Sequence, residues 1–192
     1  FVLEGGSIES DGMGTLLTTS ECLLSPNRNG QKNKVEIEEY LKSVFQVRQI
    51  LWLDDGYLAG DDTDSHIDTL ARFCPADTIV YVQCEDETDE HYEALQAMEE
   101  QLHSFRTLNG EPYRLLALPM ADKIVEEGER LPATYANFLI LNGTILYPTY
   151  NQPENDRRAC EVLQEAFPGY QMVGIDCRPL IKQHGSLHCV TM

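Results

Sequence analysis

The sequence predicts an α/β fold built from a repeated unit of two strands, a helix and a third strand. Short apolar runs typical of strands alternate with three longer segments whose apolar residues recur every three or four positions. This order occurs three times at a period of roughly 65–70 residues, which indicates an array of supersecondary units. On periodicity alone, a plain α+β domain with coincidental regularity is the alternative.

The first predicted unit contains a turn at 11–14 (DGMG) between two strands. Its helix places Val35, Leu41, Val44 and Phe45 near one stripe, and a buried strand follows. The predicted elements are the strands 1–10 and 15–19, the helix 34–46 and the strand 49–53.

The second and third units repeat this order, and a fourth unit begins near the end of the chain. A long helix carries Tyr92, Leu95, Met98 and Leu102 at helical spacing, and Asn142-Gly143 is a strong hairpin signal. The predicted elements are 67–73, 78–84, 90–105 and 114–119 in the second unit, 137–141, 144–147, 156–167 and 171–176 in the third, and a strand over 186–191. No low-complexity linker divides the chain, so residues 1–192 are expected to form one domain.

Composition narrows the classes of partner. The net charge of −18, from 14 basic and 32 acidic residues, disfavours nucleic acid and weakly favours a cationic small molecule. No apolar run is long enough for a membrane span, and residue 1 does not open a signal peptide. Six cysteines without a CxxC pair are typical of free thiols, which predicts a cytoplasmic protein.

Three polar clusters lie at or beside the first strand of a unit: 3–7 (LEGGS), 60–68 (GDDTDSHID) and 185–191 (GSLHCVT). The second lacks the glycine and the final acid of a calcium loop. If it is a strand, His66 and Asp68 share a face, which suits acid–base chemistry; a strand-end histidine with a solvated aspartate is the alternative.

Cys189 follows a glycine-containing turn and begins an apolar run. A lone cysteine there is usually a core residue, and a thiolate nucleophile needs a nearby imidazole or dipole. Neighbouring residues on a strand face opposite sides, so His188 is predicted to be a poor direct activator of Cys189. An activator from another unit, His66, is the hypothesis that remains.

Taken in order, the clusters resemble the family of agmatine deiminases and bacterial peptidylarginine deiminases. Two further segments carry the resemblance, 16–29 (LLTTSECLLSPNRN) and 135–138 (YANF). The resemblance implies a five-unit, pseudo-symmetric α/β propeller (the guanidine-modifying fold), of which this chain holds about three units from the C-terminal part. The N-terminal part, with a further guanidinium-binding aspartate and an aromatic wall, is expected to be missing.

By this resemblance, Cys189 attacks the guanidinium carbon of agmatine and forms a covalent amidino intermediate, with no metal or other cofactor. His66 protonates the leaving ammonia and activates water, and Asp68 holds the guanidinium nitrogens. Glu4 supports the site, and Asn137 and Gly185 are implied substrate-binding residues. The products would be N-carbamoylputrescine and ammonia.

One departure concerns Ser65, where the family usually has glycine; the exchange is harmless if φ stays negative there. The alternatives are a peptidylarginine or arginine deiminase of the same mechanism, a non-catalytic piece that pairs with its N-terminal half or forms a homo-oligomer, and a thiol protease. No arginine lies inside the three clusters, which favours agmatine over substrates that carry an α-carboxylate.

Overall fold

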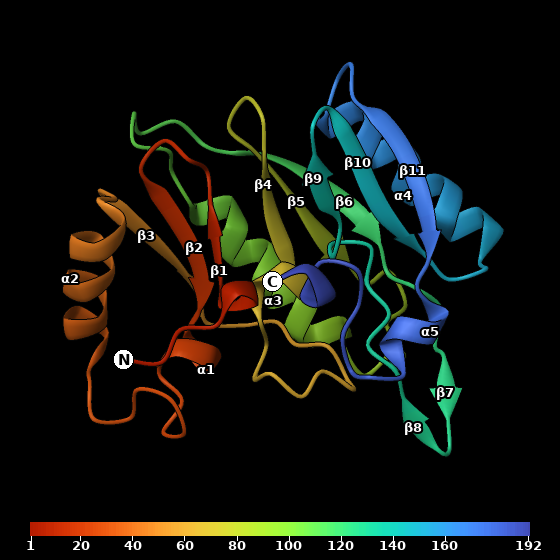
Figure 1. Cartoon of the computed structure of the whole chain (residues 1–192), viewed down its shortest axis with the longest axis horizontal. Helices are drawn as coiled ribbons and strands as arrows, with labels where there is room; N and C mark the ends of the chain where they lie inside the picture. The colour runs from red at the N-terminus through yellow and green to blue at the C-terminus, as the bar shows by residue number, and fades with distance from the viewer.

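The computed structural model describes residues 1–192 and contains three separate three-stranded sheets, each with one helix (Figure 1). In each sheet the first two strands are antiparallel and the third is parallel to the second, so a helix carries the chain back between them. The units are β1 (Ile8–Ser10), β2 (Thr15–Thr19), α2 (Lys34–Phe45) and β3 (Gln49–Leu53); β4 (Ala71–Cys74), β5 (Thr78–Gln83), α3 (Tyr92–Ser104) and β6 (Arg114–Pro119); and β9 (Leu139–Leu141), β10 (Thr144–Thr149), α4 (Pro153–Ala166) and β11 (Gln171–Asp176).

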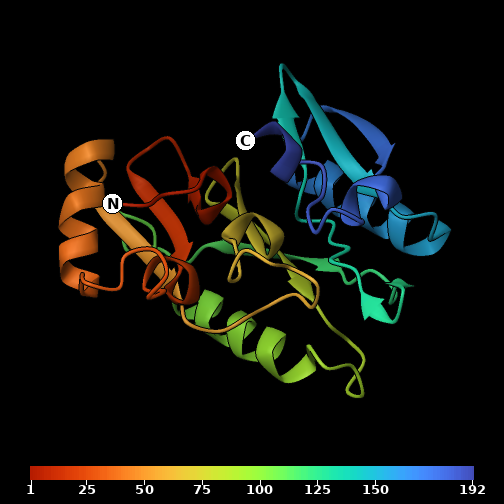
Figure 2. The same ribbon diagram turned by 60° about the horizontal axis from the view of Figure 1, so that its bottom comes forward.

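The predicted strand–strand–helix–strand unit is therefore confirmed three times. Figure 2 shows the units in sequence order across the molecule, with no strand pairing between sheets. These residues hold three units and no closed ring, and the five-unit ring implied by the resemblance stays a prediction. The remaining elements are short: α1 (Ser20–Leu23), the hairpin β7 (Val125–Glu126) with β8 (Glu129–Arg130), α5 (Arg178–Ile181), and the 3₁₀ turns η1 (Gly5–Ser7), η2 (Ile67–Thr69) and η3 (Cys189–Thr191).

Local sequence explains where the helices begin and end. Asn33 caps α2 by accepting from the Glu36 amide at 3.0 Å, while the Glu36 carboxylate accepts from the Asn33 amide at 2.8 Å. Gln46 then takes a left-handed conformation that ends the helix. Pro153 opens α4, where its missing amide hydrogen costs nothing.

The core has two parts. The larger cluster of 32 buried residues joins the second and third units to one face of the first, and includes Leu95, Met98 and Leu102 of α3. A smaller cluster of seven lies under α2 and takes only Ile37 and Leu41 from that helix. The predicted stripe on α2 was therefore mostly wrong, because Val35, Val44 and Phe45 are exposed.

Three predicted strand segments are wrong at the polar clusters, where the chain forms 3₁₀ turns. In each turn a hydroxyl bonds to the carbonyl three residues earlier: Ser7 to Glu4 at 2.6 Å, Thr69 to His66 at 2.8 Å, and Thr191 to His188 at 2.7 Å. A Ser or Thr side chain that bonds local backbone competes with strand pairing. The strand of a fourth unit predicted over 186–191 is absent for this reason.

No helix of the chain combines the length and the apolar composition that a membrane span requires.

Candidate active site

The three 3₁₀ turns lie close together in space, although they are far apart in the sequence, at residues 5–7, 67–69 and 189–191. In Figure 1 the C-terminal turn η3 lies beside η1 and the start of β4. A Cβ on Gly5 would lie 2.5 Å from the Met192 side chain, so the end of the chain contacts η1. The turns bring Glu4, His66, Asp68 and Cys189 together, as the hypothesis from sequence requires.

Gly6 permits this close approach. A Cβ at this position would lie 2.7 Å from His66 Nδ1 and 2.9 Å from Asp68 Oδ2, both shorter than real Cβ contacts. The imidazole and the carboxylate therefore face the same point on the η1 backbone. Gly6 was noted in the sequence only as half of a Gly-Gly pair, and the structure shows why a side chain is excluded there.

Asp68 is fully buried at the centre of the cluster. Its Oδ2 lies 2.8 Å from His188 Nδ1 and 3.7 Å from Cys189 Sγ. Its Oδ1 is buried and has no hydrogen-bond partner. A buried carboxylate oxygen without a donor is costly unless a ligand supplies one, so this oxygen indicates a site for a cationic donor.

Asn137 holds the Cys189 segment in place. Its side-chain oxygen accepts from the backbone amides of His188 at 2.8 Å and Cys189 at 3.2 Å. Its side-chain nitrogen lies 3.3 Å from Cys189 Sγ and 3.2 Å from the Asp68 carbonyl. Gly185 contacts the same cysteine, since a Cβ there would lie 3.1 Å from Cys189 Cβ. Asn137 and Gly185, both predicted to bind substrate, thus lie against the Cys189 segment.

Burial, and then the charge of Asp68, raise the pKa of the Cys189 thiol to about 11. The hydrogen bonds from Asn137 and from the Ser186 backbone act in the opposite direction but are weaker. The thiolate form is therefore disfavoured while no cation is bound near Asp68. A cation on Asp68 would offset the second cause and favour the thiolate.

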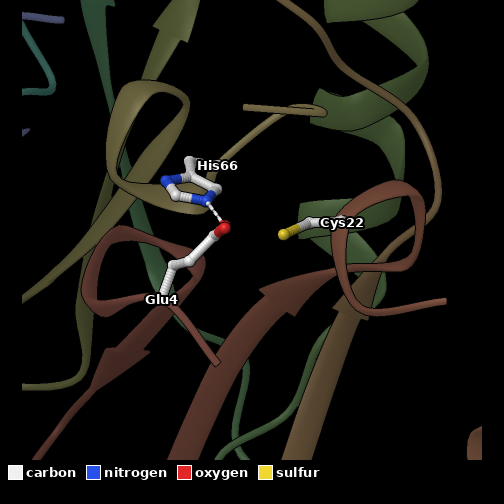
Figure 3. A group of neighbouring side chains, drawn as sticks. All are labelled: Glu4, Cys22 and His66. Carbon is white, nitrogen blue, oxygen red and sulfur yellow. Dashed lines mark hydrogen bonds and ion pairs between the residues drawn. The ribbon is translucent and has the colours of Figure 1, made fainter. Parts of the chain in front are cut away.

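His66 pairs with Glu4 on the side away from Gly6. His66 Nε2 lies 2.6 Å from Glu4 Oε2, so the ring donates from Nε2 and leaves Nδ1 free (Figure 3). His66 and Asp68 lie on a turn and not, as predicted, on one strand face, because the Thr69 amide and hydroxyl both bond to the His66 carbonyl.

Arg28, to which the sequence gave no role, fixes Glu4. Its guanidinium contacts Glu4 Oε2 at 2.8 Å, Asp64 Oδ2 at 2.6 Å and the Thr63 carbonyl at 2.9 Å. Although burial alone would raise the pKa of Glu4, the hydrogen bonds from Arg28 and His66 lower it. The carboxylate of Glu4, which bonds to His66, is thus kept ionised by an arginine whose side chain is 11% exposed.

The Ser65 departure has a different outcome from the one expected. The φ of Ser65 is +58° and that of Asp64 is +57°, so both residues occupy the left-handed region. The Ser65 hydroxyl donates to Glu21 at 2.7 Å and its amide to Asp61 at 3.0 Å, and these bonds hold the turn that presents His66. The negative φ that would make the exchange harmless is therefore not present.

Glu4, Cys22 and His66 place three potential metal ligands within 4.8 Å of one another (Figure 3). Two observations argue against a metal site. Arg28 already supplies a positive charge to Glu4. Burial raises the pKa of Cys22 to about 12, so its thiol resists becoming the thiolate that binds metals. The cluster is better described as the support of His66.

A cavity of about 530 Å³ lies elsewhere, beside the carboxyl ends of β5 and β6 and the first turns of α4. Its charged lining residues are largely paired, with Arg130 bound to Asp89 and Glu90, and Arg158 bound to Glu85. It contains no residue of the turn cluster. The cavity is therefore separate from the candidate site at the three turns.

Comparisons with known proteins agree with this geometry. The family model of the Porphyromonas-type peptidyl-arginine deiminases matches residues 1–192. A candidate agmatine deiminase of Marinomonas sp. (strain MWYL1) is 37% identical, over 99% of this chain and 56% of its own length.

Two solved structures are close in fold. A candidate arginine deiminase from Porphyromonas gingivalis is 57% identical with a TM-score of 0.96, over 99% of this chain and 56% of its own. A cysteine-to-serine variant of the C. jejuni agmatine deiminase with substrate bound is 46% identical with a TM-score of 0.93, over 98% and 55%. The chain spans about half the length of these relatives. It belongs to the family of the Porphyromonas-type peptidyl-arginine deiminases.

Proposed function

We propose that this chain carries the nucleophile and the acid–base group of an agmatine deiminase, which hydrolyses agmatine to N-carbamoylputrescine and ammonia. The observation that carries the proposal is Asp68, whose Oδ1 is buried without a partner and whose Oδ2 lies 3.7 Å from Cys189 Sγ. A guanidinium group offers the planar set of N–H donors that this carboxylate lacks. Bound there, its carbon would lie within reach of the thiol.

In the proposed first step, the guanidinium binds Asp68 and offsets the charge that disfavours the Cys189 thiolate. His66 takes the thiol proton at Nδ1, and the sulfur attacks the guanidinium carbon. The C–N bond to one terminal nitrogen then breaks, and His66 returns its proton to the departing ammonia. An amidino group remains bonded to Cys189.

In the proposed second step, His66 takes a proton from water as the water oxygen attacks the same carbon. The C–S bond breaks, a carbonyl forms as the remaining hydroxyl proton is lost to solvent, where it converts the released ammonia to ammonium, and His66 returns its proton to the sulfur. Glu4 would stabilise the positively charged His66 in both steps, since it accepts from Nε2 at 2.6 Å. One water is consumed and one ammonia is released for each guanidinium.

The alternative substrate is a peptidylarginine or free arginine, as the matched family and the P. gingivalis relative suggest by name. Such substrates carry a carboxylate or backbone that calls for a cationic or polar partner. The two arginines that contact the cluster are already paired, Arg28 with Glu4 and Asp64, and Arg72 with Glu9. This pairing favours agmatine.

We also propose that full activity needs the part of the family fold that these 192 residues do not contain. The test compares ammonia release from agmatine, arginine and a peptidylarginine by residues 1–192, alone and with the complementary part of the fold, beside Cys189→Ala. Agmatine as the best substrate, with no turnover by the alanine variant, supports the proposal. Turnover that persists in Cys189→Ala would overturn it.

A further inference from the structure

His188 differs from His66 in what surrounds its ring. Its Nδ1 lies 2.8 Å from Asp68 Oδ2, and its Nε2 lies 3.4 Å from an Arg72 terminal nitrogen. Both neighbours and His188 itself are buried. The sequence had set His188 aside because a strand would turn it away from Cys189. The strand is absent, and the ring contacts the carboxylate beside that cysteine.

Arg72 has little freedom to move. Its Nε donates to Glu9 at 2.8 Å, and a terminal nitrogen donates to the Phe138 carbonyl at 2.7 Å. Its guanidinium also stacks on the Phe138 ring, with 4.8 Å to the ring centroid. It thereby joins β1, β4 and the segment before β9. The remaining terminal nitrogen is held against His188 by these contacts.

This arrangement determines where the imidazole proton lies. A guanidinium can only donate, so the His188 nitrogen that faces Arg72 must accept. The ring is then neutral and carries its proton on Nδ1, where it donates to Asp68. The same contact supplies Asp68 Oδ2 with its donor and leaves Oδ1 free for a ligand.

We propose that His188 is a positioning residue, held by Arg72 as the neutral Nδ1–H tautomer so that it orients Asp68 toward a guanidinium. This inference rests on the proposed function and adds a residue to it. His188 does not exchange protons with the substrate. It fixes which oxygen of Asp68 is available and which way that oxygen points.

The kinetic test uses two substitutions in the full-length protein. His188→Leu removes the donor, whereas His188→Asn keeps an amide nitrogen near the position of Nδ1. The KM for agmatine is expected to rise about tenfold or more in the leucine variant, with a smaller fall in kcat, because Asp68 binds the guanidinium before and during the reaction. The asparagine variant is expected to recover most of this loss. His103→Asn, at an exposed histidine, is the matched control.

Equal losses in both variants would reduce His188 to a packing role and overturn the inference, as would an unchanged KM in His188→Leu. Nitrogen NMR of the imidazole at neutral pH provides a second test that needs no activity. A neutral ring protonated on Nδ1 is expected; protonation on Nε2, or on both nitrogens, would overturn the inference. A wild-type protein that releases no ammonia from any guanidine would instead overturn the proposed function.

Discussion

His66 and His188 lie on different turns of one cluster. Each is part of a row of three side chains, a histidine, a carboxylate and an arginine, but the order along the row differs. At His66 the carboxylate of Glu4 stands between the imidazole and Arg28. At His188 the imidazole stands between the carboxylate of Asp68 and Arg72. His66 has one partner, Glu4, and leaves Nδ1 free, whereas both ring nitrogens of His188 face a partner. Under the proposed function we therefore expect His66 to carry protons and His188 to act as a fixed donor.

The largest effect expected from this comparison is on His66. His66→Gln removes the group that exchanges protons in both proposed steps, so kcat should fall about 10²- to 10⁴-fold, within the usual range for general acid–base groups. The measurement is ammonia release from agmatine under saturating substrate. His103→Gln, an exposed histidine, is the control and should leave kcat unchanged. A His66 variant less impaired than His188→Leu would reverse the assignment of the two roles.

The substitution Gly6→Ala tests whether His66 and Asp68 must both lie close to the η1 backbone. Gly6→Ala places a methyl group within 3 Å of both His66 Nδ1 and Asp68 Oδ2. Displacing either group by a fraction of an ångström should lower kcat/KM by about 10²-fold. Gly5→Ala is the control, since its methyl would meet only the flexible Met192 side chain. Equal and small effects of the two substitutions would contradict the described approach.

Arg28 sharpens the comparison on the His66 side. Arg28→Met removes the ion pair that fixes Glu4, so kcat should fall. The fall should be only about tenfold, because Glu4 can still reach His66 without Arg28. Arg157→Met is the matched control, because Arg157 forms exposed pairs with Glu154 and Glu161 on α4. The pH profile of kcat separates the two explanations: loss of orientation alone leaves its shape unchanged, whereas a changed charge on Glu4 moves its acidic limb.

The smallest expected effect concerns the thiol itself. Asp68→Asn removes the second-largest of the causes that raise the pKa of Cys189 to about 11, so that pKa should fall toward its ordinary value of 9.0. Since the thiolate is the reactive form, alkylation of Cys189 by iodoacetamide at pH 8 should speed up several-fold, with about tenfold for each unit of pKa. Peptide mapping distinguishes Cys189 from Cys22, and Asp62→Asn, at an exposed site, is the control. A slower reaction in Asp68→Asn would show that Asp68 does not oppose the thiolate.

The repeat and most strand and helix positions could be predicted because each rests on local periodicity. β2, β3, β6 and β11 have the predicted bounds, and the helices differ by a few residues at their ends. The three polar clusters were assigned to strands because an apolar run such as Cys-Val-Thr fits a strand. The hydroxyls of Ser7, Thr69 and Thr191 closed turns there instead, and no periodicity reports that competition.

The site was predicted in part. Cys189, His66, Asp68 and Glu4 do converge, and Asn137 and Gly185 contact the same segment. Arg28 and Arg72 could not have been assigned, because each acts through partners more than twenty residues away in sequence. His188 was set aside on a strand geometry that the chain does not adopt. The sequence showed that His188 directly precedes Cys189, but the orientation of its ring depends on the turn.

The most direct measurement is mass spectrometry of acid-quenched turnover with agmatine. The account predicts an amidino adduct on the peptide that contains Cys189, formed during ammonia release and absent from Cys189→Ala. Release of ammonia with no adduct on that peptide, or an adduct on Cys22 in its place, would contradict the assignment of Cys189 as the nucleophile.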